Sequence, residues 1–176
     1  MSIDENSQTV WVRVAVERFS GSLLRYAQML TGDLDEARDI VQDTFIRLCA
    51  QKPGRIEAHL AQWLFRVCRN RALDIQRKQR RMRPLNETEM SSQASPEPSP
   101  ATQAERRDTS GEISALLAKL PKNQEEVVRL KFQEGLSYRE ISEITELSVS
   151  NVGFLIHTAL KAVRQQMKVE PKRRIP

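Results

Sequence analysis

The chain has 176 residues, enough for one ordinary domain or two small ones. Its composition, 39% hydrophobic with two tryptophans, two tyrosines and five phenylalanines, favours small helical bundles over a sheet protein with a thick core. The net charge of +5 is modest, so its placement along the chain matters more than its size. No apolar run approaches the roughly 20 residues that span a bilayer, and the start, "MSIDENSQTV", lacks the basic-then-apolar order of a secretory signal. We therefore expect a soluble, cytoplasmic protein without membrane insertion.

Three helical stretches are predicted in the first half of the chain, over about 9 to 30, 34 to 48 and 58 to 82. Thr31-Gly32-Asp33 ends the first helix and caps the second, and "QKPGR" separates the second from the third. No continuous alternation typical of strands occurs. The positions expected to face the core are Trp11, Val14, Ala15, Phe19, Leu23, Ala27, Leu30, Leu34, Ala37, Val41, Thr44, Phe45, Leu48, Leu60, Leu64, Val67, Cys68, Ala72 and Ile75.

The only two cysteines, Cys49 and Cys68, fall among apolar neighbours on these helices, so reduced and buried thiols are expected. The two histidines, His59 and His157, complete no zinc-binding spacing with them. His157 is expected to be a polar surface residue rather than a pH switch. No metal ion or other cofactor is predicted.

A polar, proline-rich stretch over residues 84 to 111 separates the two halves of the chain. It holds four of the eight prolines and no aromatic residue. Such a segment buries too little apolar surface to offset its ordering entropy. We expect a flexible, semi-extended linker between one domain at 1 to 83 and another at 112 to 176.

Four more helices are predicted after the linker. The first is closed by a proline, and "KNQEEVVRLKFQEG" forms the second, with Gly135 as its C-cap. Ser137 begins the third, with a glutamate at the capping-box spacing, and Ser148 begins the fourth, which runs to about Met167. A tight turn between the last two is the architecture of a helix-turn-helix. The predicted fold class is therefore all-α, with two small helical domains joined by the linker.

The third helix of the first domain carries a strongly basic run. Residues 66 to 83, "RVCRNRALDIQRKQRRMR", hold eight basic residues and one acid, Asp74. The face away from the apolar stripe carries Arg66, Asn70, Arg77 and Arg81. This imbalance favours a polyanionic partner, nucleic acid above all, and a solvated surface is the alternative. Residues 161 to 176 add six basic residues against a single acid.

The helix before it has the opposite charge. Five acidic residues and one basic residue lie between 33 and 43. Outside the apolar stripe this helix lines up Asp35, Asp39, Gln42 and Ile46. Because phosphate would be repelled, a protein partner is favoured over a solvated face. A metal-dependent nuclease also places paired carboxylates in this way, but no third ligand or general base is visible.

The last helix divides its apolar residues between two faces. At 100° per residue, the core side should hold Val152, Leu155, Ile156, Ala159 and Val163. The outer side carries Ser150, Phe154, His157, Lys161 and Lys168, flanked by Asn151 and Thr158. One hypothesis is that this helix binds a DNA groove with a preference for A·T pairs, because Asn151 can pair with adenine and Phe154 can contact a thymine methyl. Lys161 and Arg164 would then bind phosphates. The other hypothesis packs Phe154 under the linker, the tail or the other domain.

Three segments resemble bacterial sigma factors of the sigma-70 type, in particular the extracytoplasmic-function group (group IV). "DEARDIVQDTFIRL" is similar to the conserved helix of region 2, and "WLFRVCRNRALDIQRKQRR" is similar to the promoter-melting helix that follows it. "LPKNQEEVVRLKFQEGLSYREISEITELSVSNV" resembles the region 4 helices with their helix-turn-helix. The two blocks match in order, and the linker lies where such proteins have one.

The resemblance implies a factor that directs core RNA polymerase to promoters and performs no catalysis itself. It implies that the face gripping the coiled coil of the β′ subunit includes Asp35, Asp39, Gln42 and Asp43. Asn70 matches the position that holds a flipped-out base of the melted minus-10 strand. The phosphate contacts around it would come from Arg66, Arg69, Arg77 and Arg81.

Region 4, by the same resemblance, binds the minus-35 duplex and touches the flap of the β subunit. From the outer face of the last helix, the residues of this chain expected to contact that duplex are Ser150, Asn151, Phe154, His157, Lys161 and Arg164. Promoter DNA, both double- and single-stranded, and core polymerase are therefore the expected partners. Whether an anti-sigma factor is a further partner stays open.

The recognition helix departs from the family pattern. Where the family has "GTVKSRL", this chain has "SNVGFLI", so the lysine and arginine are missing at Gly153 and Leu155. Glu146 replaces the glycine normal in the turn, and Thr145 replaces a leucine. These changes put the usual way of reading the minus-35 element in doubt.

Two other functions stay open on the sequence. One is a stand-alone helix-turn-helix regulator whose first domain serves dimerisation or sensing. The other is a sigma mimic that sequesters an anti-sigma partner, against which the basic run argues, since a mimic needs no DNA face. An enzyme has no catalytic constellation to support it.

Overall fold

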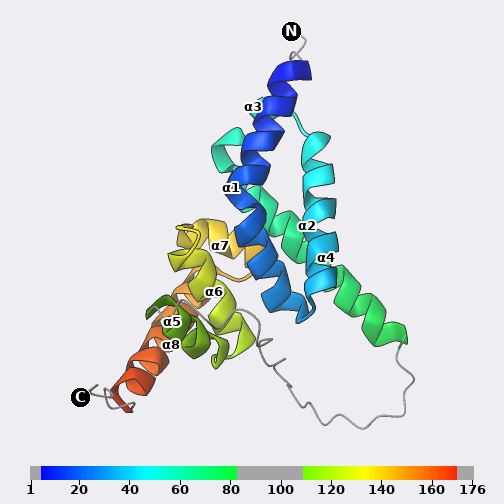
Figure 1. Ribbon diagram of the computed structural model, residues 1–176. Coiled ribbons are helices and arrows are strands. Elements are labelled where there is room, and N and C mark those ends of the chain that lie inside the picture. Colours follow the sequence, from blue (N-terminus) through cyan, green and yellow to red (C-terminus); the bar gives the residue numbers. More distant parts are fainter. Residues whose placement is uncertain (1–4, 83–108, 170–176) are drawn as a thin grey trace, which may run out of the picture. The chain divides into compact units, whose positions relative to one another are not determined.

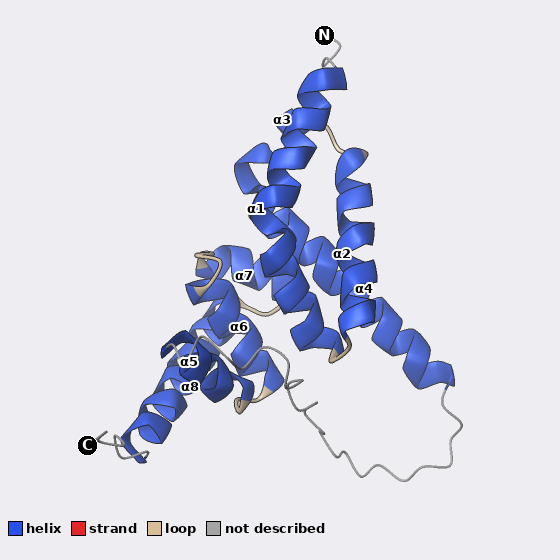
Figure 2. Cartoon of the chain, in the orientation of Figure 1, coloured by secondary structure: helices blue, strands red, loops and turns tan. Residues whose placement is uncertain are grey.

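The described part of the chain is helical throughout. The structure, a computed structural model, describes residues 5–82 and 109–169 (Figure 1), and within these ranges every regular element is a helix (Figure 2). The two ranges belong to two compact units. The predicted all-α fold with two helical domains is confirmed, whereas the predicted linker lies outside the described residues except at its very end.

The first unit is a bundle of three long helices. α1 (Glu5–Thr31) packs against α2 (Leu34–Cys49) and α4 (Leu60–Met82), and α2 also packs against α4. The break between the last two holds two short elements, α3 (Pro53–Ile56) and the 3-10 helix η1 (Glu57–His59). The core includes the fully enclosed side chains of Leu23, Ala27, Ala37, Ile40, Leu48, Leu64, Phe65, Cys68 and Ala72.

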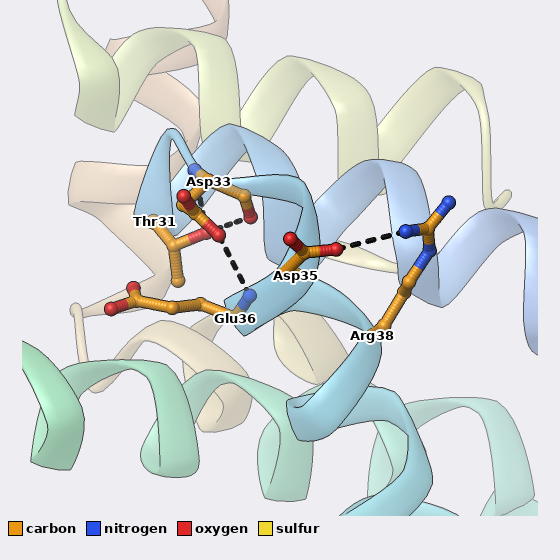
Figure 3. A network of polar contacts seen from close by, with 5 residues as sticks. All are labelled: Thr31, Asp33, Asp35, Glu36 and Arg38. Carbon is orange, nitrogen blue, oxygen red and sulfur yellow. Dashed lines mark hydrogen bonds and ion pairs between the residues drawn. The ribbon is translucent and has the colours of Figure 1, made fainter.

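A tight corner joins α1 to α2, as the sequence predicts. Gly32 adopts a φ of +77°, which a side chain would disfavour. Asp33 is the N-cap of α2, and its carboxylate accepts a hydrogen bond of 2.8 Å from the backbone N–H of Glu36. The Thr31 hydroxyl donates to the Asp33 carbonyl at 3.0 Å (Figure 3). We call these residues, 30–36, the α1–α2 corner.

The described part of the second unit has four helices, and the three shorter ones pack on the longest. α5 (Thr109–Ala118), α6 (Lys122–Phe132) and α7 (Tyr138–Thr145) all contact α8 (Val149–Val169). α5 begins slightly earlier than expected, inside the last residues assigned to the linker. The core includes Leu116, Leu117, Leu120, Val127, Val128, Leu130, Ile141, Ile144, Val152, Ile156 and Ala159.

The helix-turn-helix of α7 and α8 is built from local hydrogen bonds. Ser137 and Glu140 form the predicted capping box: the Glu140 carboxylate accepts from the Ser137 N–H at 2.7 Å, and the Ser137 hydroxyl accepts from the Glu140 N–H at 3.2 Å. Hydrogen bonding to the side chain of Ser137, and then to its backbone N–H, lowers the pKa of the Glu140 carboxyl. Glu146 ends α7 in the left-handed conformation, with φ 62° and ψ 22°. The Ser148 hydroxyl then accepts from the Asn151 N–H at 3.2 Å and starts α8.

Several positions expected in the core are exposed instead. Val14 is 52% exposed, because the bundle covers the neighbouring side of α1, where Ala15 is buried. Leu34 stands at the first residue of α2 and is 38% exposed. Cys49 is exposed, contrary to the expectation of a buried thiol, because it ends α2 just beyond the enclosed Leu48.

The end of α6 also differs from the prediction. Gln133, in a right-handed helical conformation, is the C-cap, and Gly135 follows in the loop with a φ of +70°. The N–H of Leu136 still reaches back to the Leu130 carbonyl at 3.2 Å. Gly135 therefore provides the left-handed turn after the helix rather than the cap itself.

Candidate protein and nucleic-acid interfaces

The acidic face of α2 is exposed, as the spacing predicts. Asp35, Asp39, Gln42 and Ile46 all lie on the surface, whereas the opposite side of the helix holds the buried residues. Asp35 forms an ion pair with Arg38 at 2.9 Å (Figure 3). Ile46 is 60% exposed and gives the carboxylate face an apolar end. A surface that combines carboxylates with an exposed isoleucine suits a basic protein partner better than nucleic acid.

Asp43 borders the other predicted docking residues and, unlike them, is paired with α4. Its carboxylate Oδ2 is 2.8 Å from Nε of Arg71 on α4, and the two side chains are 41% and 39% exposed. α2 and α4 are thus joined by a pair of opposite charges. Residue spacing alone does not indicate this contact, because Arg71 counts equally well as one more cation of the basic run.

The basic face of α4 is exposed along its length. Arg66, Asn70, Arg77 and Arg81 are on the surface, and Arg69 is half-buried. The opposite side of the helix is buried through Leu64, Phe65, Cys68 and Ala72. At 1.5 Å per residue, Arg66 and Arg81 are about 22 Å apart along the axis. Because phosphates of one strand follow at about 3.4 Å, this face can follow several nucleotides.

Burial makes Cys68 an inert packing residue beneath that face. The thiol is enclosed, and desolvation raises its pKa to about 12. A thiol with so high a pKa supplies almost no thiolate, the reactive form. The prediction of a buried, reduced cysteine is confirmed at this position.

The first three turns of α8 present a neutral surface. Ser150, Asn151 and His157 are exposed, and Phe154 is 65% exposed. No Lys, Arg, Asp or Glu occurs from 149 to 160, and the first cations, Lys161 and Arg164, are exposed on later turns. The predicted core side is confirmed, since Val152, Leu155, Ile156 and Ala159 are buried and Val163 is partly buried.

Tyr138 and Lys131 lie beside this surface, and the sequence reasoning missed them. A Cβ on Gly153 would lie 3.6 Å from Cε2 of the Tyr138 ring, an ordinary contact distance, so the ring lies against α8 at this glycine. The Lys131 ammonium is 5.3 Å from the centre of the same ring and donates to the Leu136 carbonyl at 3.1 Å. The spacing of the residues in the sequence does not indicate either contact, because both depend on how α7 packs against α6 and α8.

Within the described ranges, no three His, Cys, Asp or Glu side chains gather in a way that could hold a metal ion. In the same ranges, no helix is long and apolar enough to cross a membrane.

Comparison with known families assigns both units. Residues 15–82 match the family described as Sigma-70 region 2, and residues 110–163 match the family described as Sigma-70, region 4. The first match covers α2 and α4 with most of α1. The second covers α5 to α7 and most of α8.

Known proteins resemble the chain over nearly its whole length. The ECF RNA polymerase sigma factor SigM of Bacillus subtilis is 26% identical over 153 residues, which cover 86% of this chain and 90% of that protein. The ECF RNA polymerase sigma factor SigL of Mycobacterium tuberculosis is 28% identical over 161 residues, 90% of this chain and 89% of that one. Among solved structures, the sigma factor RpoE in complex with the anti-sigma factor NepR, from Bartonella quintana, matches with a TM-score of 0.59 and 19% identity over 90% of this chain and 98% of that one. This last likeness supports the fold alone.

Proposed function

We propose that this chain, which belongs to the sigma-70 family of sigma factors and to its extracytoplasmic-function group, binds core RNA polymerase, recognises the minus-35 and minus-10 promoter elements and promotes melting of the DNA. One observation carries the proposal: the region 2 and region 4 units follow one another in a single chain. The first of them has an acidic helix beside a basic one.

Docking on the polymerase is assigned to the acidic face of α2. Asp35, Asp39 and Gln42 are exposed there, with Ile46 at the end of the row. We propose that they bind the coiled coil of the β′ subunit, carboxylates to its cations and the isoleucine to an apolar side chain. Asp43 borders this surface and also holds Arg71.

Capture of the melted minus-10 strand is assigned to the basic face of α4. Asn70 is exposed between arginines, where its amide can pair with a base that has left the stack. The phosphates of the strand are assigned to the guanidinium groups of Arg66, Arg69, Arg77 and Arg81. Unstacking costs a few kcal/mol, which base pairing to the amide and neutralised phosphates can offset.

Reading of the minus-35 duplex is assigned to α8, with a preference for A·T pairs. Asn151 can pair with adenine, and the exposed ring of Phe154 can contact a thymine methyl. Ser150 and His157 stand on the same side, and Lys161 and Arg164 would bind phosphates further along the helix. The exposure of Phe154 favours this role over packing within the described part of its own unit. Contact between region 4 and the flap of the β subunit is proposed as well.

The chain itself needs no catalytic group for this function. The polymerase makes the RNA, and the sigma factor contributes position and strand separation. We therefore propose a non-enzymatic factor that works where the polymerase is, in the cytoplasm. The solved relative binds an anti-sigma factor, so a protein of that class is a candidate partner here.

In vitro transcription with purified core polymerase tests the function. Transcripts from a library of genomic promoters should appear only when both the chain and core polymerase are present. DNA footprints should likewise require core polymerase. A footprint of the chain alone at its target, without any binding to core polymerase, would establish a stand-alone regulator and refute the sigma function.

A further inference from the structure

The basic helix α4 has no fully buried side chain in its last turns. Its buried residues end at Ala72, whereas the exposed Arg77 and Arg81 follow later. At 1.5 Å per residue, Arg81 lies about 14 Å beyond the last buried residue. The direction of this half of the helix therefore depends on polar contacts as well as on its half-buried side chains.

Two glutamines of the C-terminal half of α4 form hydrogen bonds with the α1–α2 corner. The amide of Gln76 donates to the Leu30 carbonyl at 2.6 Å. Leu30 lies in the last turn of α1, where carbonyls have no partner within the helix. The amide of Gln79 donates to the Glu36 carboxylate at the start of α2. The end of the basic helix is thus tied to both ends of the corner.

Arg71 and Asp43 form the third contact, one turn before the glutamines. Nε of Arg71 is 2.8 Å from Oδ2 of Asp43. An ion pair this exposed adds little to folding stability. It is a charge pair and not an aligned hydrogen bond, and it links the helix assigned to the polymerase with the helix assigned to the DNA.

We propose that Asp43 is a positioning residue that acts on α4 through Arg71, rather than a contact for the polymerase. The inference rests on the proposed sigma function. With the two glutamine contacts, the pair holds Arg77 and Arg81 in the direction in which they meet the phosphates of the melted strand. Side chains fixed before binding lose less conformational entropy when they bind.

Asp43→Asn tests this proposal because positioning and simple electrostatics predict opposite signs. Removing a carboxylate beside a DNA-binding helix should, by charge alone, strengthen binding to DNA. Positioning predicts slower promoter opening by the holoenzyme, by about five-fold, the upper end for an exposed ion pair. The affinity for core polymerase should stay within about two-fold, since the ion pair is internal to the chain.

Partner and control variants complete the experiment. Arg71→Gln should slow opening as Asp43→Asn does, and the double variant should be no slower than the slower single variant, because both remove one contact. Arg71→Lys keeps the positive charge and should open promoters faster than Arg71→Gln. It also replaces Arg71→Gln in the comparison if the Arg71→Gln variant fails to fold. Asp39→Asn, on the exposed acidic face, should weaken core binding. Glu17→Gln removes an exposed carboxylate on α1 and should change neither quantity.

Three results would decide against the proposal. Core binding weakened by Asp43→Asn as much as by Asp39→Asn would make Asp43 a polymerase contact. Unchanged or faster promoter opening by Asp43→Asn would remove its positioning role. Failure of the unaltered chain to bind core polymerase would instead overturn the sigma function itself, and the wild-type control separates that outcome from the other two.

Discussion

Replacing Glu146 by glycine should stabilise the region 4 unit. In the described part of the chain, Glu146 is the one residue other than glycine with a positive φ. Holding an L-residue in this left-handed conformation costs about 1–2 kcal/mol. Glycine removes that cost but has more freedom in the unfolded chain, which offsets about 0.5–1 kcal/mol. The net gain in the free energy of unfolding should be roughly 0.5–1 kcal/mol, or about 2–8 °C in the melting temperature of a domain this small.

Thermal unfolding followed by two spectroscopic signals separates the melting of the second structural unit from that of the first. Far-UV circular dichroism reports all helices, whereas both tryptophans, Trp11 and Trp63, lie in the first unit. Glu146→Gly should raise the transition of the second unit in circular dichroism and leave the tryptophan fluorescence transition unchanged.

Gly135→Ala is the matched control with the opposite sign. Gly135 has a φ of +70°, and a Cβ placed there meets no atom within 4 Å. The substitution should therefore destabilise the same unit by about 1 kcal/mol through the backbone alone. A melting temperature lowered by Glu146→Gly, alongside the expected loss for Gly135→Ala, would refute the strain assigned to Glu146.

Four further results are expected. Asp39→Lys should weaken binding to core polymerase by about ten-fold or more in a titration, because it reverses a charge facing a basic partner; unchanged affinity would move the docking surface elsewhere. Asn70→Ala should reduce promoter opening by roughly ten-fold, about 1–3 kcal/mol of base recognition, and should spare core binding; equal loss of both would point to misfolding. Phe154→Ala should lower the preference for the A·T-rich minus-35 element by about five-fold in competition footprinting, and an unchanged preference would leave the ring a packing role only. Glu140 has a lowered pKa in the folded state, so it adds stability that is complete above the ordinary glutamate pKa and is lost as the pH falls through the lowered value. Glu140→Gln should therefore make the loss of stability at acidic pH less steep. An unchanged loss at acidic pH would contradict the capping role.

Local signals in the sequence were sufficient for the helix ends and the charged faces. Asp33 and Ser137 cap helices through atoms only three residues away, so their roles follow from spacing. The acidic face of α2 and the basic face of α4 follow from helical periodicity for the same reason. These features depend on neighbours in the chain and not on the tertiary fold.

Features that depend on tertiary packing were not predictable in this way. A periodic stripe does not tell which of its edges the bundle covers, and Val14 turned out to lie on the uncovered side of α1. The pair of Asp43 with Arg71 joins two helices, and the approach of Tyr138 to Gly153 depends on the crossing of α7 and α8. Periodicity assigns a residue to a face, whereas its partner depends on how the helices pack.

The neutral start of α8 has a consequence for cells under osmotic stress. Binding that releases counterions weakens steeply as intracellular potassium rises, with a slope of about −0.7 to −0.9 per phosphate neutralised. Hydrogen bonds from Asn151 and apolar contact by Phe154 release none, so binding of the upstream element, where only Lys161 and Arg164 are assigned to phosphates, should weaken less than binding by the arginine-rich helix. Promoters with a strong upstream element would then lose less transcription as the ionic strength rises than promoters that rely on the melted strand.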